Sequence, residues 1–198
     1  GRVVATEDPD GERYDSDFVG IAIGLDFNTE FLHDTDVERE DAIIVDEYMQ
    51  TNVDDVYAAG DITKFHDVIL GEQAQNGAWG SAKQQGAVAG KNMIADDTEE
   101  VFEWVSSYSI THFDFPFLSF GHPTRGDEMI ARKYSDDEWR SLAIKDGTIV
   151  GGVLIGDLSP QSDYKRLMRE QTPVGDHTDL LLEQDFDADQ IAAPEQDA

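Results

Sequence analysis

The residues best placed to do chemistry are a glycine and an aspartate at the end of an apolar run. Residues 56–61 read VYAAGD, so the sequence predicts a strand over residues 55–59 that stops at Gly60 and Asp61. A glycine has no Cβ and lets a ligand approach the backbone, and an aspartate carboxylate can accept hydrogen bonds from two sugar-type hydroxyls. Ligands of open α/β sheets bind at the carboxyl ends of strands. The segment therefore indicates a ligand site, while an ordinary Gly-Asp turn stays open.

Other catalytic chemistry finds little support in the residue types present. The chain has no cysteine, and its five histidines show no metal-ligand spacing, so no metal site is expected. These histidines are interpreted as scattered surface residues: His33, His66, His112, His122 and His177. For His122, a place in a loop is favoured over a proton-donating role. Ser119 has no evident base, which argues against acyl chemistry. No side chain is assigned as a catalytic acid, base or nucleophile.

The charge of the chain limits its partners and its habitat. Among 198 residues, 43 are acidic and 14 basic, for a formal net charge of −29. Such a field repels phosphate backbones and anionic lipids, so neither nucleic-acid nor membrane binding is expected. No apolar run approaches the ~18 residues of a spanning helix, and a cytoplasmic location is expected. The acidic residues are dispersed and lysines are few, which favours a halophilic source; an ordinary acidic protein is the alternative.

The elements that must position Gly60 and Asp61 lie in the first half of the chain. The sequence predicts strands over residues 2–6 and 17–24 around a turn, the latter buried on both faces, and a further buried strand over 42–45. Residues 77–95 predict a helix. Its recurring larger or apolar positions are Trp79, Ala82, Val88 and Met93.

The character of the sequence changes near residue 100, which predicts a domain boundary. Strands are expected over residues 113–120, 129–134, 140–145 and 148–155. The last two are joined by Asp146-Gly147, a strong signal for a tight hairpin. A short helix is expected over 160–171, and residues 184–198 are interpreted as a largely loose tail.

Three ordered segments resemble the carboxyl-terminal half of FAD-dependent pyridine-nucleotide oxidoreductases. Residues 17–24 resemble the strand that returns the chain from the NAD domain to the FAD domain. Residues 44–61, ending in VYAAGD, are similar to the second FAD motif of the family. Residues 79–93, WGSAKQQGAVAGKNM, resemble the helix whose amino end faces the flavin. The resemblance implies FAD as cofactor and NAD(P)H as electron donor.

The later segments look like the terminal domain of NADH:rubredoxin reductases and of the large subunit of NADH-dependent nitrite reductases. The resemblance implies an α/β fold: a partial two-dinucleotide-domain fold for FAD and NAD(P), followed by a small α+β domain. The expected boundaries are 1–24 for the end of the NAD(P)-binding domain, 25–99 for the closing segment of the FAD-binding domain, 100–172 for the terminal domain, and 173–198 for an acidic, largely loose tail.

The resemblance also implies which residues contact the cofactor. The implied FAD-site residues are Gly24, Asn28, Gly60, Asp61, Ala78 and Trp79. The chain departs from the family pattern at three places, because Phe27 stands where proline is common, Gly77 where glutamate is common, and Leu118 where tryptophan is common.

No G-x-G-x-x-G fingerprint for FAD or NAD occurs in the chain. The expectation is therefore that the amino-terminal half of the enzyme is missing and that this piece alone is inactive. Electrons are expected to pass from NAD(P)H through FAD to a small redox protein or another acceptor, with a homodimer as a possibility. The alternative is a non-enzymatic module for assembly or protein interaction.

Overall fold

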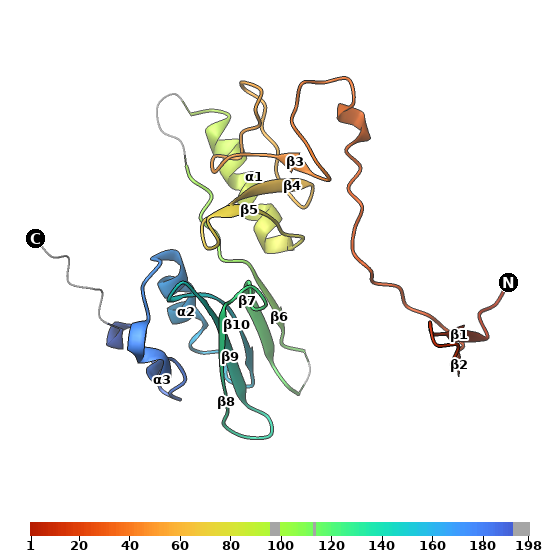
Figure 1. Cartoon of the computed structure of the whole chain (residues 1–198). Helices are drawn as coiled ribbons and strands as arrows, with labels where there is room; N and C mark the ends of the chain where they lie inside the picture. The colour runs from red at the N-terminus through yellow and green to blue at the C-terminus, as the bar shows by residue number, and fades with distance from the viewer. Residues whose placement is uncertain (96–99, 113, 192–198) are drawn as a thin grey trace, which may run out of the picture.

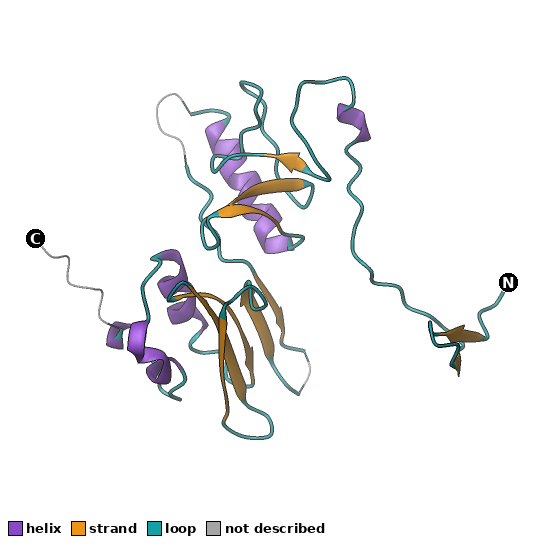
Figure 2. Cartoon of the chain, in the orientation of Figure 1, coloured by secondary structure: helices purple, strands orange, loops and turns teal. Residues whose placement is uncertain are grey.

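The computed structural model describes residues 1–95, 100–112 and 114–191. The described residues form three separate sheets (Figures 1 and 2). One is a small hairpin near the amino terminus, one is a three-stranded sheet packed on a long helix, and one is a five-stranded antiparallel sheet with a helix on one face. An α/β architecture followed by an α+β unit is thus present.

The amino-terminal hairpin consists of β1 (Ala5–Glu7) and β2 (Arg13–Asp15), paired antiparallel. Figure 1 shows it apart from the rest, joined by a long extended segment. The expected strand over residues 17–24 is wrong: this stretch has no strand, and Phe18 and Ile23 are 85% and 91% exposed. The described part of the chain provides no partner strand for it, so its apolar side chains remain on the surface.

The three-stranded sheet has the order β3 (Ile43–Ile44), β4 (Thr63–Asp67) and β5 (Glu72–Gln75), with β3 and β4 parallel and β5 antiparallel. The short helix η1 (Glu30–Leu32) precedes it. The buried strand expected over 42–45 is present as β3. The strand expected over 55–59 is wrong, because this stretch makes only the isolated bridge between Gln50 and Tyr57, and the strand begins after Asp61.

The helix expected over 77–95 is confirmed as α1 (Trp79–Asn92). Of the positions singled out from the sequence, Val88 is buried, but Trp79 is 81% and Met93 64% exposed. The residues that face the sheet recur every three or four positions and include three polar ones: Ser81, Gln85, Val88, Ala89 and Asn92. Val88 and Ala89 enter the core of this unit, where Phe65 of β4 meets Phe102 edge to face at 5.1 Å.

The five-stranded sheet has the order β6-β7-β10-β9-β8, and every neighbouring pair is antiparallel. Its strands are β6 (Ser107–Ile110), β7 (Phe117–Gly121), β8 (Glu128–Lys133), β9 (Trp139–Lys145) and β10 (Thr148–Ile155). The hairpin at Asp146 and Gly147 is confirmed, with φ angles of 50° and 78°. The strands β8, β9 and β10 match the predicted ranges closely, whereas β7 begins four residues later than the range predicted over 113–120. Strand β6 was not predicted, and residue 113 lies outside the described residues. The short helix is confirmed as α2 (Gln161–Arg169).

The expectation of a largely loose tail over 173–198 is wrong for residues 173–191; residues 192–198 lie outside the described part. Three short helices follow α2: η2 (Gly175–His177), α3 (Thr178–Leu181) and η3 (Ala188–Gln190). The core of the five-stranded unit includes residues well beyond α2, among them Leu181, Phe186 and Ile191, each at most 6% exposed. The sheet therefore uses this acidic segment as part of its cover.

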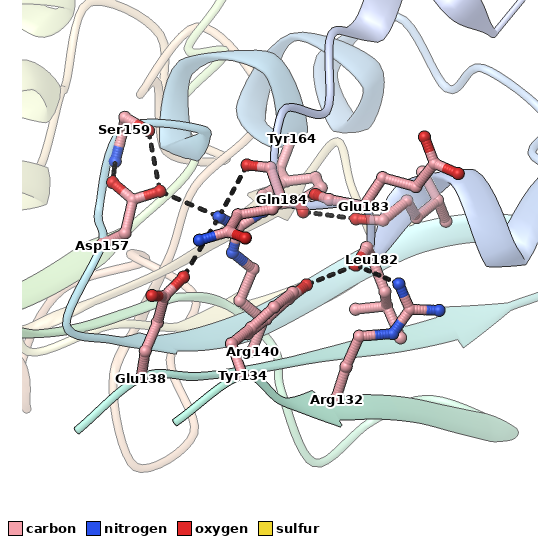
Figure 3. A network of polar contacts seen from close by, with 11 residues as sticks. Arg132, Tyr134, Glu138, Arg140, Asp157, Ser159, Tyr164, Leu182, Glu183 and Gln184 are labelled. Atoms are coloured by element: carbon pink, nitrogen blue, oxygen red, sulfur yellow. Dashed lines mark hydrogen bonds and ion pairs between the residues drawn. The ribbon is translucent and has the colours of Figure 1, made fainter. Parts of the chain in front are cut away.

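A buried arginine anchors the tail (Figure 3). The Arg140 side chain is fully buried, donates to the Asp157 carboxylate at 2.8 Å, and donates to the carbonyls of Glu183 and Gln184 at 2.9 and 3.1 Å. The hydroxyls of Tyr134 and Tyr164 donate to the carbonyls of Leu182 and Leu181 respectively. The side chains of Tyr134, Arg140 and Tyr164 thus hold four consecutive backbone carbonyls. Hydrophobic patterns in the sequence do not reveal such contacts.

The two larger units meet at the turn between β4 and β5. Ile69 of this turn is 5% exposed and belongs to the core of the five-stranded unit. Asp67 accepts a hydrogen bond from His122 Nε2 at 2.8 Å, so His122 is not a free surface histidine as expected. Burial alone would raise the pKa of Asp67, but His122 and the amides of Leu70 and Ile69 outweigh it and hold that pKa below its ordinary value. Arg125 pairs with Glu72 beside it.

Two kinds of feature are absent from the residues that the structure describes. No helix there is long and apolar enough to cross a membrane. The same residues contain no group of three acidic, histidine or cysteine side chains arranged to hold a metal ion.

Candidate functional site

Gly60 occupies a turn that only glycine adopts without strain. Its φ is +99°, in the region that L side chains rarely enter. A Cβ placed there would have no heavy atom within 4 Å, so the backbone faces open space on that side. The conformation, rather than crowding, is the reason for glycine here, and the open side leaves room for another molecule to approach the main chain.

Asp61 follows directly and is half-buried. Within the described ranges, its carboxylate makes no hydrogen bond and no ion pair. Its backbone carbonyl accepts a hydrogen bond from Gln75 Nε2 at 3.2 Å, and its Oδ2 lies 3.8 Å from where a Cβ on Gly77 would stand. The carboxylate therefore lies beside the loop that leads into α1, with its hydrogen-bonding capacity unused by the surrounding side chains.

A cavity of about 440 Å³ borders this loop. It is lined by Leu25, Asp26, Phe27, Asn28, Thr29, Glu30, Asp41 and Gln75. Asn28 thus lines the same cavity as Gln75, whose side chain donates to the Asp61 carbonyl, although Asn28 and Gln75 are far apart in sequence. Gly24 has φ +104° and lies on the exposed extended segment before this cavity; the described contacts do not bring it to Asp61.

The start of α1 completes the site. Ala78 is the N-cap residue, 3% exposed, and it offers no side-chain hydrogen bond to the first helical amides. Trp79 is exposed, with Lys83 Nζ 5.6 Å from its ring centroid. No acidic residue lies in the first turn, so the positive end of the helix dipole is not neutralised by the helix itself.

Three residues of this neighbourhood were not foreseen from the sequence. Gln85 is fully buried and binds the Gly60 amide at 2.7 Å. The Oδ1 atom of Asn76 and the Nε1 atom of Trp104 are buried, and neither has a hydrogen-bond partner in the described part of the structure. Trp104 packs near Gly80 at the start of α1. Its Cζ2 atom lies 3.7 Å from the position that a Cβ on Gly80 would occupy. Of these three residues, only Gln85 could have been found from the sequence, because it is a polar residue at a core-facing position of the helix.

Known protein families match two separate stretches of the chain. Residues 1–86 match the family described as pyridine nucleotide-disulphide oxidoreductase, and residues 109–172 match the rubredoxin NAD+ reductase C-terminal domain. The chain is 28% identical over 211 residues to pyridine nucleotide-disulfide oxidoreductase domain-containing protein 1 of Drosophila melanogaster, covering 94% of this chain and 43% of that protein. It is 26% identical over 157 residues to the NADH-rubredoxin oxidoreductase of Clostridium acetobutylicum, covering 79% and 40%.

A solved structure agrees on the fold. The ferredoxin reductase of Rhodopseudomonas palustris superposes with a TM-score of 0.82 at 18% identity, covering 96% of this chain and 47% of that one. The chain spans less than half the length of each of these three proteins. Both family matches agree with the order of units in the fold, and together they cover Gly60, Asp61 and the whole of β7 to β10. Residues 1–86 therefore match an FAD- and NAD(P)H-dependent oxidoreductase family, and residues 109–172 match the rubredoxin reductase type of C-terminal domain.

Proposed function

We propose that this chain forms one side of an FAD site in an oxidoreductase that passes electrons from NAD(P)H through FAD to a small redox protein. The observation that carries the proposal is the Asp61 carboxylate, which is half-buried and has no partner within the described residues. It directly follows Gly60, whose backbone is open to close approach. A carboxylate so placed is suited to accept hydrogen bonds from ribityl hydroxyls.

The residues around Asp61 fit such a group. Buried polar atoms in proteins nearly always have hydrogen-bond partners, and the buried Oδ1 of Asn76 has none in the described part. This atom precedes α1 by three residues and can accept a hydrogen bond from a bound molecule. The buried Trp104 Nε1 is a donor in the same neighbourhood. An acceptor and a donor without partners, both near the start of α1, favour a polar ligand at this place.

When bound, FAD would supply the hydride and electron transfer, and the protein supplies position and electrostatics. Asp61 and Gly60 would hold the ribityl chain, and Asn28 is proposed to line the same site from the extended segment. The amino end of α1, at Ala78 and Trp79, would stabilise negative charge on the cofactor through the helix dipole. Gly24 stays a prediction from the resemblance alone. No side chain of the described residues is assigned a proton-transfer role.

The proposal also covers the electron acceptor and the domain limits. A small redox protein is favoured as the acceptor because one relative is an NADH-rubredoxin oxidoreductase. We retain the boundaries 1–24, 25–99 and 100–172, and place the structured residues 173–191 with the terminal domain. A cytoplasmic location and a homodimeric state remain predictions from the sequence. The alternative, a non-enzymatic assembly module, gives the unpaired carboxylate of Asp61 no role.

A reduction experiment tests the proposal. The purified holoprotein should show a flavin band near about 450 nm that NADH or NADPH bleaches without oxygen. Rubredoxin or ferredoxin should then restore the band. If the full-length protein purifies without flavin, and neither binds added FAD nor reacts with either nucleotide, the assembly module is favoured instead.

A further inference from the structure

We propose that Gln85 is a positioning residue for the flavin site, with its buried amide holding the Gly60–Asp61 turn against the first turn of α1. The inference rests on the proposed function, because it concerns how Asp61 is presented to FAD. Gln85 itself is 0% exposed and cannot touch a ligand that approaches from the open side of Gly60. Its effect on the cofactor is therefore transmitted through the turn.

Three hydrogen bonds define the role of the Gln85 amide. Its Oε1 accepts from the backbone N–H of Gly60 at 2.7 Å and lies 2.8 Å from Thr63 Oγ1. Its Nε2 donates to the hydroxyl of Ser81 at 3.2 Å. One side chain thus joins the turn before β4, the first residue of β4 and the first turn of α1.

The orientation of this amide follows from its partners. The Gly60 N–H can only donate, so it must face the carbonyl oxygen of Gln85 and not the NH₂ group. That choice directs Nε2 towards Ser81. Thr63 is also fully buried, and its single hydroxyl proton is shared between two nearby acceptors, Gln85 Oε1 and the Gly60 carbonyl, both at 2.8 Å. The network allows one amide orientation only.

Within the described residues, the Gln85 oxygen is the partner of the Gly60 N–H, whereas the other hydrogen bonds of the turn reach its carbonyl groups. The Gly60 carbonyl accepts from the N–H and hydroxyl of Thr63 at 3.0 and 2.8 Å, and the Asp61 carbonyl accepts from Gln75 at 3.2 Å. Gly60 has no side chain to pack, and a Cβ there would meet nothing within 4 Å. Without the Gln85 acceptor, the Gly60 N–H loses its partner, and other φ values become accessible to this glycine. The direction of the next carboxylate, on Asp61, then becomes less defined.

A second buried amide on the same helix provides a matched control. Asn92 is 4% exposed at the far end of α1 and also makes three hydrogen bonds. Its Nδ2 donates to the carbonyls of Tyr48 and Glu100, and its Oδ1 accepts from the Glu100 N–H. Replacing Asn92 removes comparable buried bonds from the same helix without touching Gly60 or Asp61.

The experiment compares Gln85→Met with Asn92→Met in the holoprotein, measuring FAD affinity, the visible circular dichroism of the bound flavin, and the melting temperature of the apoprotein. Gln85→Met should weaken FAD at least tenfold and alter the flavin dichroism. Asn92→Met should lower the melting temperature but change FAD affinity less than twofold. If both variants weaken FAD in proportion to their loss of stability, Gln85 is a structural residue and the proposal is overturned.

Milder variants cover the case in which Gln85→Met does not fold. Gln85→Glu keeps acceptors for Gly60 and Thr63, and the Ser81 hydroxyl can turn to donate to it, so this variant should retain more FAD affinity than Gln85→Met. Thr63→Val removes one hydroxyl and should weaken FAD by an intermediate factor. Unchanged affinity in Thr63→Val, together with equal losses in the two Gln85 variants, would contradict the proposal.

An Asp61→Ala variant separates this inference from the proposed function. If Asp61→Ala binds FAD as tightly as the parent, the proposed function fails. If Asp61→Ala weakens FAD while Gln85→Met does not, the proposed function stands and only the positioning role of Gln85 is refuted.

Discussion

Asp157→Ala should destabilise the five-stranded unit strongly, because it leaves a buried guanidinium without its closest carboxylate. The Arg140 side chain is 0% exposed, and its Nη2 lies 2.8 Å from Asp157 Oδ2. Removing one partner of a buried ion pair costs about 3–5 kcal/mol. The Asp157 side chain is 37% exposed, and Glu138 Oε1 remains 3.7 Å from the guanidinium. We therefore expect the lower end of this range, about 3 kcal/mol.

Urea unfolding followed by tryptophan fluorescence measures this loss, with Asp136→Ala as the control. Asp136 pairs with Lys133 at 2.7 Å, but the two side chains are 95% and 62% exposed, so its removal should cost under about 1 kcal/mol. Limited proteolysis should also cleave Asp157→Ala near residues 182–184, whose carbonyls bind the neighbouring donors. Equal unfolding free energies for the two variants would refute the view that Arg140 anchors the tail.

Two further predictions concern pH and salt. The pKa of Asp67 is held below its ordinary value, so its contribution to stability is present above the unfolded-state pKa of about 3.9 and is lost as pH falls through the lower folded-state pKa. In urea titrations, Asp67→Asn should therefore lose less unfolding free energy than the parent protein as the pH falls from about 5 to 2. An equal loss in the two proteins would exclude this role of Asp67. With a net charge of −29, the chain should melt at higher temperature as KCl rises to molar concentration, because salt screens self-repulsion. A flat or falling midpoint would remove the halophile prediction.

Local signals explain what the sequence predicted well. The hairpin at Asp146 and Gly147 was predictable because two adjacent residues with positive φ suffice to reverse the chain between alternating strands. The helix α1 was predictable from length and composition, although its buried face was not. That face holds the polar residues Ser81, Gln85 and Asn92, and apolar periodicity does not identify these three positions as buried.

Long-range contacts explain the features that could not be predicted from the sequence. A strand needs a neighbour, and the apolar stretch at 17–24 has none among the described residues, whereas β4 carries polar Thr63 and Asp67 on its buried side. The tail is held through backbone carbonyls that accept from Arg140 and two tyrosines, and no side-chain pattern within 181–184 records this. Gly60 and Asp61 were identified as a pair, but the Gln85 amide that binds Gly60 lies 25 residues away.

The measurement that tests the central claim most directly is the affinity of the holoprotein for FAD after removal of the Asp61 carboxylate. Two charge-assisted hydrogen bonds of about 1.5–3 kcal/mol each would be lost in Asp61→Ala, so FAD should bind at least tenfold more weakly. Asp54→Ala is the control, since its neighbour Asp55 has φ +64° and alanine there would add backbone strain. Asp54 is exposed, and its replacement should change affinity less than twofold. If Asp61→Ala and Asp61→Asn both purify with full flavin content and unaltered affinity, Asp61 is a turn residue and the assignment of the site is wrong.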